Sequence, residues 1–392
     1  MELKKYKLGE ILDVTRGASL SGEFYATEGE YIRLTCGNFD YQNNCFKENK
    51  SKDNLYYTGD FRSEFLMEKG DIITPLTEQA IGLLGSTAII PESGKYIQSQ
   101  DVAKIICKED LLDKDFAFYL IPSPLVKQQL SAAAQQTKIR HTSPDKIKDC
   151  TVWIPELAEQ KRISKLLRSL DCKIGLNRAI NQNLEAMAKQ LYDYWFVQFD
   201  FPDENGRPYK SSGGKMIWNE KLKREIPISW EIKLIDDIAE IYNGATPSTM
   251  NELNYGGDIV WITPKDLSDQ KQKFIYQGER NISQVGYDSC STHLLPSNSI
   301  LMSSRAPIGL LAIAKTELCT NQGFKNFVPK SGNTSIYLYY YLQYHIRQIE
   351  QLGTGTTFKE VSREDILKFP MLKPSDNVLD LWKETVLAIN DR

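Results

Sequence analysis

The sequence lacks the features that mark several functional classes. Its 392 residues contain no apolar run approaching 18 residues, and the first twelve residues have no apolar core, so we expect neither a membrane span nor a secretory signal. The seven cysteines never occur in CxxC spacing, and the three histidines do not occur in HExxH spacing. These absences predict a soluble, cytoplasmic protein with reduced cysteines and no metal site.

Catalytic motifs are also missing. No GxxxxGK[ST] loop is present, no GxGxxG follows a predicted strand, and no Asn/Asp-Pro-Pro-Tyr element of an amino-methyltransferase occurs. Asp203 and Glu231 with Lys233 form one nuclease-like pattern that could support magnesium-dependent cleavage. We weigh against it that such short patterns arise by chance. We therefore expect no catalytic residue and no cofactor in this chain.

An excess of positive charge is missing as well. The formal net charge is −3, with 19 Lys and Arg against 22 Asp and Glu in residues 1–150, and 22 against 23 in residues 201–392. Nucleic-acid-binding domains usually carry a basic patch or an overall positive charge. Any DNA-binding surface must therefore be local.

Four pairs of segments recur in the same order and predict a tandem repeat. Residues 7–19 resemble residues 233–246, residues 29–40 resemble 257–269, the IGLL of residues 81–84 recurs at 308–311, and residues 145–155 resemble 364–374. Each copy contains short β-branched and aromatic runs typical of strands. An amphipathic helix follows late in each copy, over residues 115–133 and 335–352. The pattern predicts an α+β fold with a pseudo-two-fold repeat.

The longest helical pattern runs over residues 155–196 and has no internal proline. A second, shorter pattern follows Pro374. Alternating spacings of four and three residues are typical of a coiled-coil seam, so we expect an antiparallel pair, with the short helix on the later half of the long one. The earlier seam, residues 163–174, would then be open to another chain or to a second copy. The two seams contain Ile163, Leu167, Leu170, Ile174, Leu184, Met187, Leu191 and Tyr194, and Leu379, Trp382, Val386 and Ile389.

These patterns divide the chain into five segments. We predict a first recognition domain at 1–153, a central helix at 154–197, an extended surface connector at 198–229, a second recognition domain at 230–373 and a truncated distal helix at 374–392.

Three ordered stretches carry a resemblance to a known family. Residues 155–163 (PELAEQKRI) resemble its helix start, P-x-L-x-E-Q-x-x-I; residues 192–197 (YDYWFV) with the following FDFPDENGRPYK resemble its central helix exit; and residues 226–231 (IPISWE) resemble the start of its second recognition domain. The chain thus resembles the specificity subunit of bacterial type I restriction-modification systems, over nearly its whole length.

The resemblance implies a non-catalytic role in phage defence. Each target-recognition domain would read half of a bipartite double-stranded DNA target, and the helices would set the unread spacer. Methyl transfer from S-adenosylmethionine and ATP- and Mg-dependent cleavage would belong to two modification subunits and to restriction subunits. The resemblance also implies partner contacts for exposed helix residues such as Lys161, Arg162, Arg168 and Tyr192.

The candidate DNA-binding residues combine positive charge with amides and hydroxyls, which position phosphates and reach base edges. The best local basic segment is 127–148, although a solvated loop explains it equally well. Further candidates lie in the loops beside the repeated IGLL, in the Arg-Gly and Asn-Gly pairs at 16–17 and 243–244, and in the Gly-Thr-rich segment 353–359, and polarity alone adds Gln322 and Lys325. They are Arg16, Thr77, Gln79, Gln136, Lys138, Arg140, His141, Thr142, Lys146, Asn243, Ser304, Arg305, Gln322, Lys325, Thr354, Thr356, Thr357 and Lys359.

One alternative function comes from a different class. The coiled coil could make the chain a protein-binding scaffold that never contacts DNA. A bipartite methylation motif that depends on residues 1–150 would distinguish recognition from scaffolding.

Overall fold

The computed structural model describes residues 2–50, 53–78, 82–133, 140–305, 307–355 and 359–390. It comprises two compact units, Met1–Arg178 (unit 1) and Ala179–Arg392 (unit 2). Both units mix helices with short strands, in agreement with the predicted α+β class. Among the described residues, no helix combines the length and the apolar content needed to cross a membrane.

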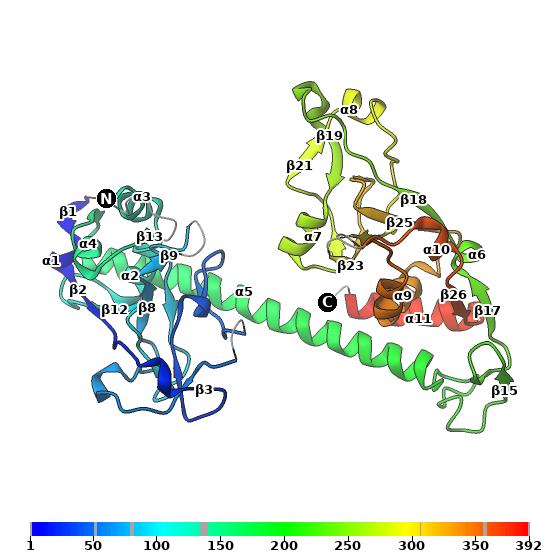
Figure 1. Cartoon of the computed structure of the whole chain (residues 1–392), viewed down its shortest axis with the longest axis horizontal. Helices are drawn as coiled ribbons and strands as arrows, with labels where there is room; N and C mark the ends of the chain where they lie inside the picture. The colour runs from blue at the N-terminus through cyan, green and yellow to red at the C-terminus, as the bar shows by residue number, and fades with distance from the viewer. Residues whose placement is uncertain are drawn as a thin grey trace. The chain divides into compact units, whose positions relative to one another are not determined.

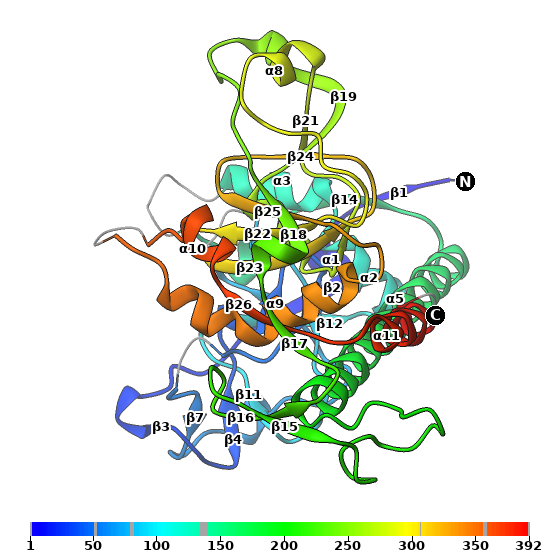
Figure 2. The same cartoon turned by 90° about the vertical axis from the view of Figure 1, so that its right-hand side faces the viewer.

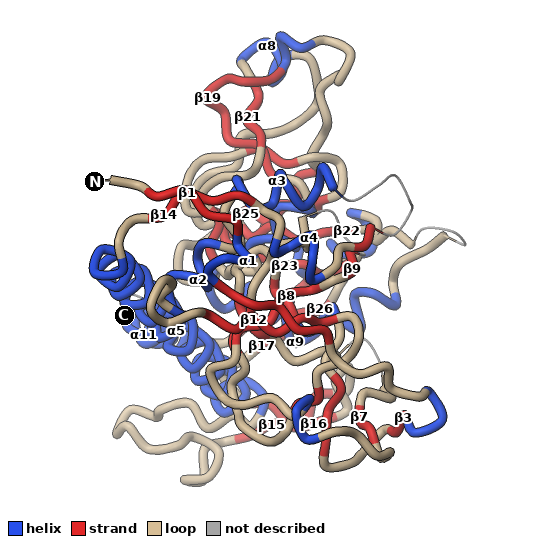
Figure 3. The backbone as a smooth tube through the Cα atoms, turned by 90° about the vertical axis from the view of Figure 1, so that its left-hand side faces the viewer, coloured by secondary structure: helices blue, strands red, loops and turns tan. Residues whose placement is uncertain are grey.

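Unit 1 is built on two four-stranded sheets, and its first strand pairs with its last: β1 (Lys4–Lys7) runs antiparallel to β14 (Thr151–Ile154). The main sheet has the order β10 (Ala88–Ile89), β8 (Ile72–Pro75), β12 (Val102–Cys107), β2 (Leu12–Arg16). Its strands β8 and β12 are labelled in Figure 3. The second sheet has the order β11 (Tyr96–Ile97), β4 (Tyr31–Arg33), β7 (Tyr56–Tyr57), β3 (Tyr25–Ala26). Leu12, Ile72 and Ile105 of the main sheet share one buried core with Phe118.

The helix predicted over residues 115–133 is two helices, so this prediction was wrong in its continuity. α2 (Lys114–Leu120) ends before Pro122, and α3 begins at Pro124 and runs to Ala133. A proline inside a helix removes one backbone hydrogen bond and clashes with the preceding turn, whereas it is tolerated in a helix's first turn. The Ile-Pro-Ser-Pro sequence therefore breaks the pattern.

Unit 2 contains a larger sheet covered by a tyrosine-rich helix (Figure 2). β17 (Glu231–Leu234) pairs with β26 (Pro370–Lys373). The main sheet has the order β18 (Ala239–Asn243), β25 (Phe324–Pro329), β22 (Ile300–Ser304), β23 (Ile308–Ala314), β20 (Phe274–Ile275). A smaller sheet has the order β21 (Arg280–Ile282), β19 (Tyr255–Ile262), β24 (Cys319–Thr320). α9 (Ser335–Gln351) buries Tyr337, Leu338 and Tyr340 in the core of the unit, as its amphipathic pattern predicts.

Corresponding strands have the same neighbours in the two units. The order β10-β8-β12-β2 matches the order β23-β22-β25-β18. A single helical turn follows β1 in unit 1 and β17 in unit 2, as α1 (Leu8–Ile11) and α6 (Ile235–Ile238). In the two IGLL segments, Gly82 and Gly309 both have a φ of +95°, a conformation that favours glycine. A Cβ at Gly309 would lie 2.4 Å from Cγ1 of Ile346, whereas a Cβ at Gly82 would meet no atom of the described residues within 4 Å.

The predicted long helix is present as α5 (Leu157–Tyr192), 36 residues long, drawn in green in Figure 1. It continues into a π-helical segment, Asp193–Val197. A helix of this length spans about 54 Å. α5 belongs to unit 1 up to Arg178 and to unit 2 from Ala179.

Gln160 anchors the start of α5, and its side chain is 1% exposed. Its Nε2 donates to the carbonyl oxygens of Leu111 (3.0 Å) and Pro155 (2.9 Å), and its Oε1 accepts from the amide of Asp113 (3.0 Å). An amide side chain is suited to this place because it both donates and accepts. The glutamine of the helix-start motif thus has a structural reason in this chain.

α11 (Asp376–Asn390) packs against the last turns of α5, as predicted (Figure 1). Trp382 is fully buried, with ring centroids 6.0 Å from Tyr192, 5.6 Å from Trp195 and 5.0 Å from Phe196. Leu379 and Val386 are also fully buried.

The prediction for the later seam of α5, at residues 184, 187, 191 and 194, was wrong by one residue. The buried side chains lie one residue further along the helix. Ala188, Tyr192 and Trp195 are buried, whereas Met187 is 55% and Tyr194 is 36% exposed. The larger aromatic area of residues 192, 195 and 196 explains which face turns inward, because burial of apolar area stabilises in proportion to that area.

The segment 198–229 was expected to be an extended connector, but much of it is folded onto unit 2. Phe199 and Phe201 are buried, and the ring of Phe201 stacks on Trp230 at 5.1 Å. β15 (Met216–Asn219) and β16 (Arg224–Pro227) form a hairpin. Its polar composition suggested exposure, but its aromatic residues join the main core of unit 2.

Candidate nucleic-acid interface

In unit 1, two candidate segments that are far apart in sequence form one small ribbon. β9 (Thr77–Glu78) pairs antiparallel with β13 (Arg140–His141), so that His141 lies opposite Thr77. The amide of Thr142 donates to the carbonyl oxygen of Leu76 (2.9 Å). His141 is exposed, and Thr77 and Thr142 are half-buried. The pairing therefore gathers three predicted residues at one place.

Other unit 1 candidates are placed less fully. Lys146 is exposed. Arg16 is also exposed, and its Nε donates to the carbonyl oxygen of Gln100 (2.8 Å). Gln79, Gln136 and Lys138, and the side chain of Arg140, lie outside the described residues.

A buried carboxylate at the end of β9 holds the backbone of Gly82 and Leu83. Glu78 is 5% exposed, and its Oε1 accepts from the amides of Gly82 (2.6 Å) and Leu83 (3.1 Å). Lys127 donates to the carbonyl oxygen of Gly82 (3.3 Å), and burial lowers the pKa of its ammonium. Because Glu78 and Lys127 make these internal contacts, both help to fix the segment that carries Thr77.

In unit 2 the corresponding segments also meet. Glu360 forms backbone bridges with both Arg305 and Thr354, and the amide of Val361 donates to the carbonyl oxygen of Ser304 (3.1 Å). Arg305 is half-exposed, and Thr354 and Lys359 are exposed. Thr356 and Thr357 lie outside the described residues. The loop before the second IGLL and the Gly-Thr-rich segment thus lie side by side.

Two of the unit 2 candidates are buried and do not present side chains to solvent. Ser304 is 0% exposed, and Lys325 is 6% exposed with its ammonium 3.1 Å from Oε1 of Glu360. Lys325 pairs with Asn243 across β18 and β25. Ser304 was predicted from its place in the loop before the second IGLL, and Lys325 was predicted from its polarity alone. Their burial gives both residues a supporting role instead. Glu360, which Lys325 and two backbone segments contact, was missed because a lone glutamate carries no signal in sequence.

Asn243 and Gln322 are exposed, and Thr246 donates a hydrogen bond to Gln322.

The glycines that follow Arg16 and Asn243 are required for the same reason. A Cβ at Gly17 would lie 2.2 Å from the carbonyl oxygen of Gln98, and one at Gly244 would lie 2.0 Å from that of Asn321. Both positions need glycine because another backbone segment passes close by.

The expected partner contacts on α5 have different surroundings. Tyr192 is 3% exposed and belongs to the core of unit 2, so it is not accessible to a partner. Arg162 forms an ion pair with Glu159, and Arg168 with Asp115. In the earlier seam, Ile163 and Leu167 are half-buried. Large apolar side chains that are 41–63% exposed line the helix at Leu166, Leu170, Ile174, Leu176 and Ile180.

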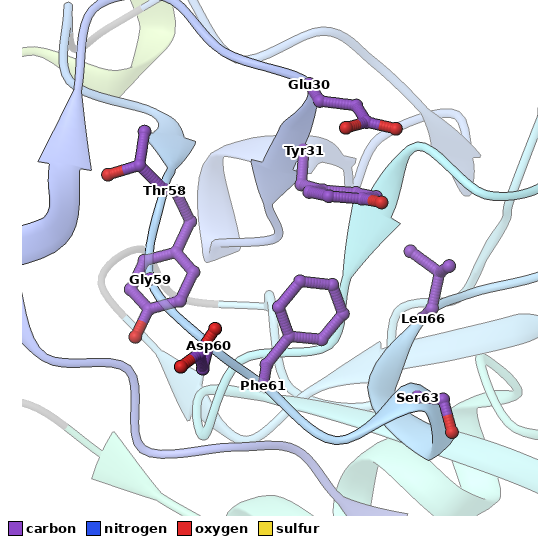
Figure 4. Close-up of a pocket in the computed structure, with 9 residues that line it drawn as sticks. Glu30, Tyr31, Thr58, Gly59, Asp60, Phe61, Ser63 and Leu66 are labelled. Atoms are coloured by element: carbon purple, nitrogen blue, oxygen red, sulfur yellow. The ribbon is translucent and has the colours of Figure 1, made fainter.

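A pocket of unit 1 that the sequence did not suggest is acidic rather than basic. It has a volume of about 560 Å³, and Tyr31 and Phe61 line it with ring centroids 5.1 Å apart. Figure 4 shows the carboxylates of Glu30 and Asp60 beside these rings. A hydrogen bond to Glu30 raises the pKa of the Tyr31 phenol. Two carboxylates would repel a phosphate, so this pocket is not part of the candidate interface.

Comparisons with known proteins find similarity to specificity subunits of type I restriction enzymes. The chain is 41% identical over 167 residues to the type I restriction enzyme MjaIX specificity subunit of Methanocaldococcus jannaschii, covering 41% of this chain and 39% of that subunit. It is 24% identical over 442 residues to the HindI specificity subunit of Haemophilus influenzae, covering 99% of this chain and 93% of that subunit.

A solved S subunit of a type I restriction-modification system from M. genitalium has a similar fold, with a TM-score of 0.61 at 14% identity, covering 100% of this chain and 90% of that one. The family model described as type I restriction modification DNA specificity domain matches residues 1–186 and 227–377. With most of both units inside that match, the chain belongs to the family of type I restriction-modification specificity subunits.

Proposed function

We propose that this chain is the DNA-recognition subunit of a type I restriction-modification complex, in which each unit reads one half of a bipartite target. The observation that carries the proposal is the gathering of candidate residues in each unit. β9 with β13 in unit 1, and the segments around Arg305 and Thr354 in unit 2, each bring together loops separated by about 50 residues or more. The matching strand orders of the two sheets support a duplicated recognition domain.

Direct readout needs side chains that donate and accept hydrogen bonds at base edges. His141, Arg305 and Thr354 present such groups at the surface or partly so. An arginine in the major groove bonds two acceptors of guanine, worth about 1–3 kcal/mol of discrimination. With no overall positive charge on the chain, we infer that partner subunits contribute much of the phosphate contact and that the chain alone binds DNA weakly.

We propose that α5 binds the partner subunits. Its exposed leucines and isoleucines lie on successive turns, as in an unfilled helix-packing face. Two modification subunits and the restriction subunits are the expected partners, and they would supply methyl transfer with S-adenosylmethionine and cleavage with ATP and magnesium. In this chain α5 and α11 would form a partial antiparallel coiled coil that sets the spacer between half-sites.

Adenine methylation in cells tests the proposal. The chain is expressed with its modification subunit in a host free of other adenine methyltransferases, and methylated positions are mapped by long-read sequencing. We expect one bipartite motif, of which replacing residues 1–153 by those of a relative changes one half and replacing residues 230–373 changes the other. A protein-binding scaffold would give no such motif, or a motif that neither exchange alters.

A further inference from the structure

A buried lysine links the main sheet of unit 2 to three helices. Lys273 immediately precedes the edge strand β20, and its side chain is 4% exposed. Its ammonium lies 2.7 Å from the hydroxyl of Tyr340 on α9, 2.9 Å from Oδ1 of Asn390 on α11 and 3.1 Å from Oε1 of Glu185 on α5. All four residues belong to unit 2.

The number of contacts matches the chemistry of the group. An ammonium has three donors and no acceptor, and each of the three distances falls within hydrogen-bonding range. The rings of Tyr340 and Phe274 lie 5.0 and 5.4 Å from the nitrogen and add cation–π attraction. Burial lowers the pKa of Lys273, and the charge of Glu185 opposes that shift. The surroundings of Lys273 therefore fit a protonated lysine, with one acceptor for each of its three N–H donors.

The contacts are directional, whereas the surrounding packing is not. Apolar burial stabilises an association in proportion to area and tolerates sliding. A buried charged group restricts the movement of the segment that carries it, because breaking one of its contacts leaves the buried charge without a partner. The segment of Lys273 and β20 can thus take one position along α5 and α11 without leaving that charge unpaired.

We infer that Lys273 is a positioning residue that fixes where the recognition sheet of unit 2 sits on α5 and α11, and that it thereby narrows the spacer lengths the protein accepts. The second half of this inference rests on the proposed function. A half-site reader held in one position accepts one spacer, because each base pair moves the half-site by about 3.4 Å and rotates it by about a tenth of a turn.

The test uses the complete complex with three variants. Lys273→Met keeps the hydrocarbon stem and removes the charge, Glu185→Gln keeps the shape and removes the partner charge, and Lys271→Met removes an exposed lysine nearby as the control. Methylation rates are measured on the native target and on targets with one base pair more or less in the spacer. We expect the ratio of native to altered-spacer rates to fall at least tenfold for the first two variants and to stay unchanged for the control.

The inference is overturned if both variants fold and the ratio of native to altered-spacer methylation rates is unchanged. Lower methylation rates with the same ratio also overturn it, because lost stability alone lowers the rates on all targets together. Glu185→Gln serves if Lys273→Met does not fold. If the wild-type complex produces no bipartite motif, the proposed function fails. Hydrogen exchange then tests only whether Lys273 fixes α11 against the sheet of unit 2. Protection of residues 376–390 that falls at least tenfold in either variant supports it, and unchanged protection in both refutes it.

Discussion

Replacing Trp382 by alanine should detach α11 from α5. The side chain is fully buried among four aromatic rings, with Tyr340 at 5.6 Å beside the three neighbours on the last turns of the long helix. Truncating a buried tryptophan to alanine costs about 3–5 kcal/mol from lost transfer energy and the remaining cavity. We expect a loss in the upper part of that range, because ring pairs add about 0.5–1.5 kcal/mol each beyond area burial.

The indole nitrogen of Trp382 allows a sharper version of this prediction. Its Nε1 is buried and has no hydrogen-bond partner among the described residues. Leaving such a donor unsatisfied costs about 1–3 kcal/mol, and phenylalanine would remove that cost while keeping an aromatic ring. We therefore expect Trp382→Phe to lose less than half of what Trp382→Ala loses.

Urea unfolding followed by far-ultraviolet circular dichroism measures both changes without relying on tryptophan fluorescence. Trp218→Ala is the control, because that side chain is 54% exposed on the β15–β16 hairpin, and it should change the free energy of unfolding by about 0.5 kcal/mol or less. A loss below about 1 kcal/mol for Trp382→Ala, or one equal to that of the control, would refute the assigned packing.

Three further predictions concern single side chains. Gly309→Ala should destabilise by at least about 1 kcal/mol more than Gly82→Ala in chemical denaturation, because both positions have positive φ but only the first also lacks space for a Cβ; equal losses would contradict this. Gln160→Met should cost about 2–4 kcal/mol, measured in the same way, because three backbone groups lose their partner; a change under about 1 kcal/mol would show that water replaces the side chain. Burial lowers the pKa of His345 below its ordinary value of 6.5, so the unfolded chain binds the proton more tightly and stability should fall as pH drops below about 6.5 toward the lower folded pKa. The free energy of unfolding of His345→Gln should change less with pH across this window than that of the unchanged chain. Parallel curves for the two proteins would show that His345 does not cause the pH dependence.

Local patterns predicted the elements better than the contacts between them. The proline-free run with its seam predicted α5, and the tyrosine-rich stretch predicted α9. The break at Pro122 follows from a local rule that the helical periodicity masked. The one-residue displacement of the α5 seam could not be predicted, because it depends on which aromatic residues meet Trp382.

The candidate interface shows the same division. Charge and polarity pointed to the segments containing Thr77 and His141, but not to their pairing as β9 and β13. Burial of Lys325 could not be foreseen, since an isolated lysine in a strand is usually exposed. Lys273 and the three groups that contact its ammonium are up to 205 residues apart, so no sequence window contains them.

The apolar side chains exposed along α5 bear on how the chain behaves during synthesis. Leu166, Leu170 and Ile174 lie one helical turn apart, and all three are at least 47% exposed. Continuous apolar surface of this kind promotes association between identical chains and retention by chaperones. Produced alone, the chain should therefore aggregate or elute at a concentration-dependent size, and co-translation with a binding partner should restore its yield. The amount of soluble recognition subunit in a cell then depends on how much of the partner subunit is made with it.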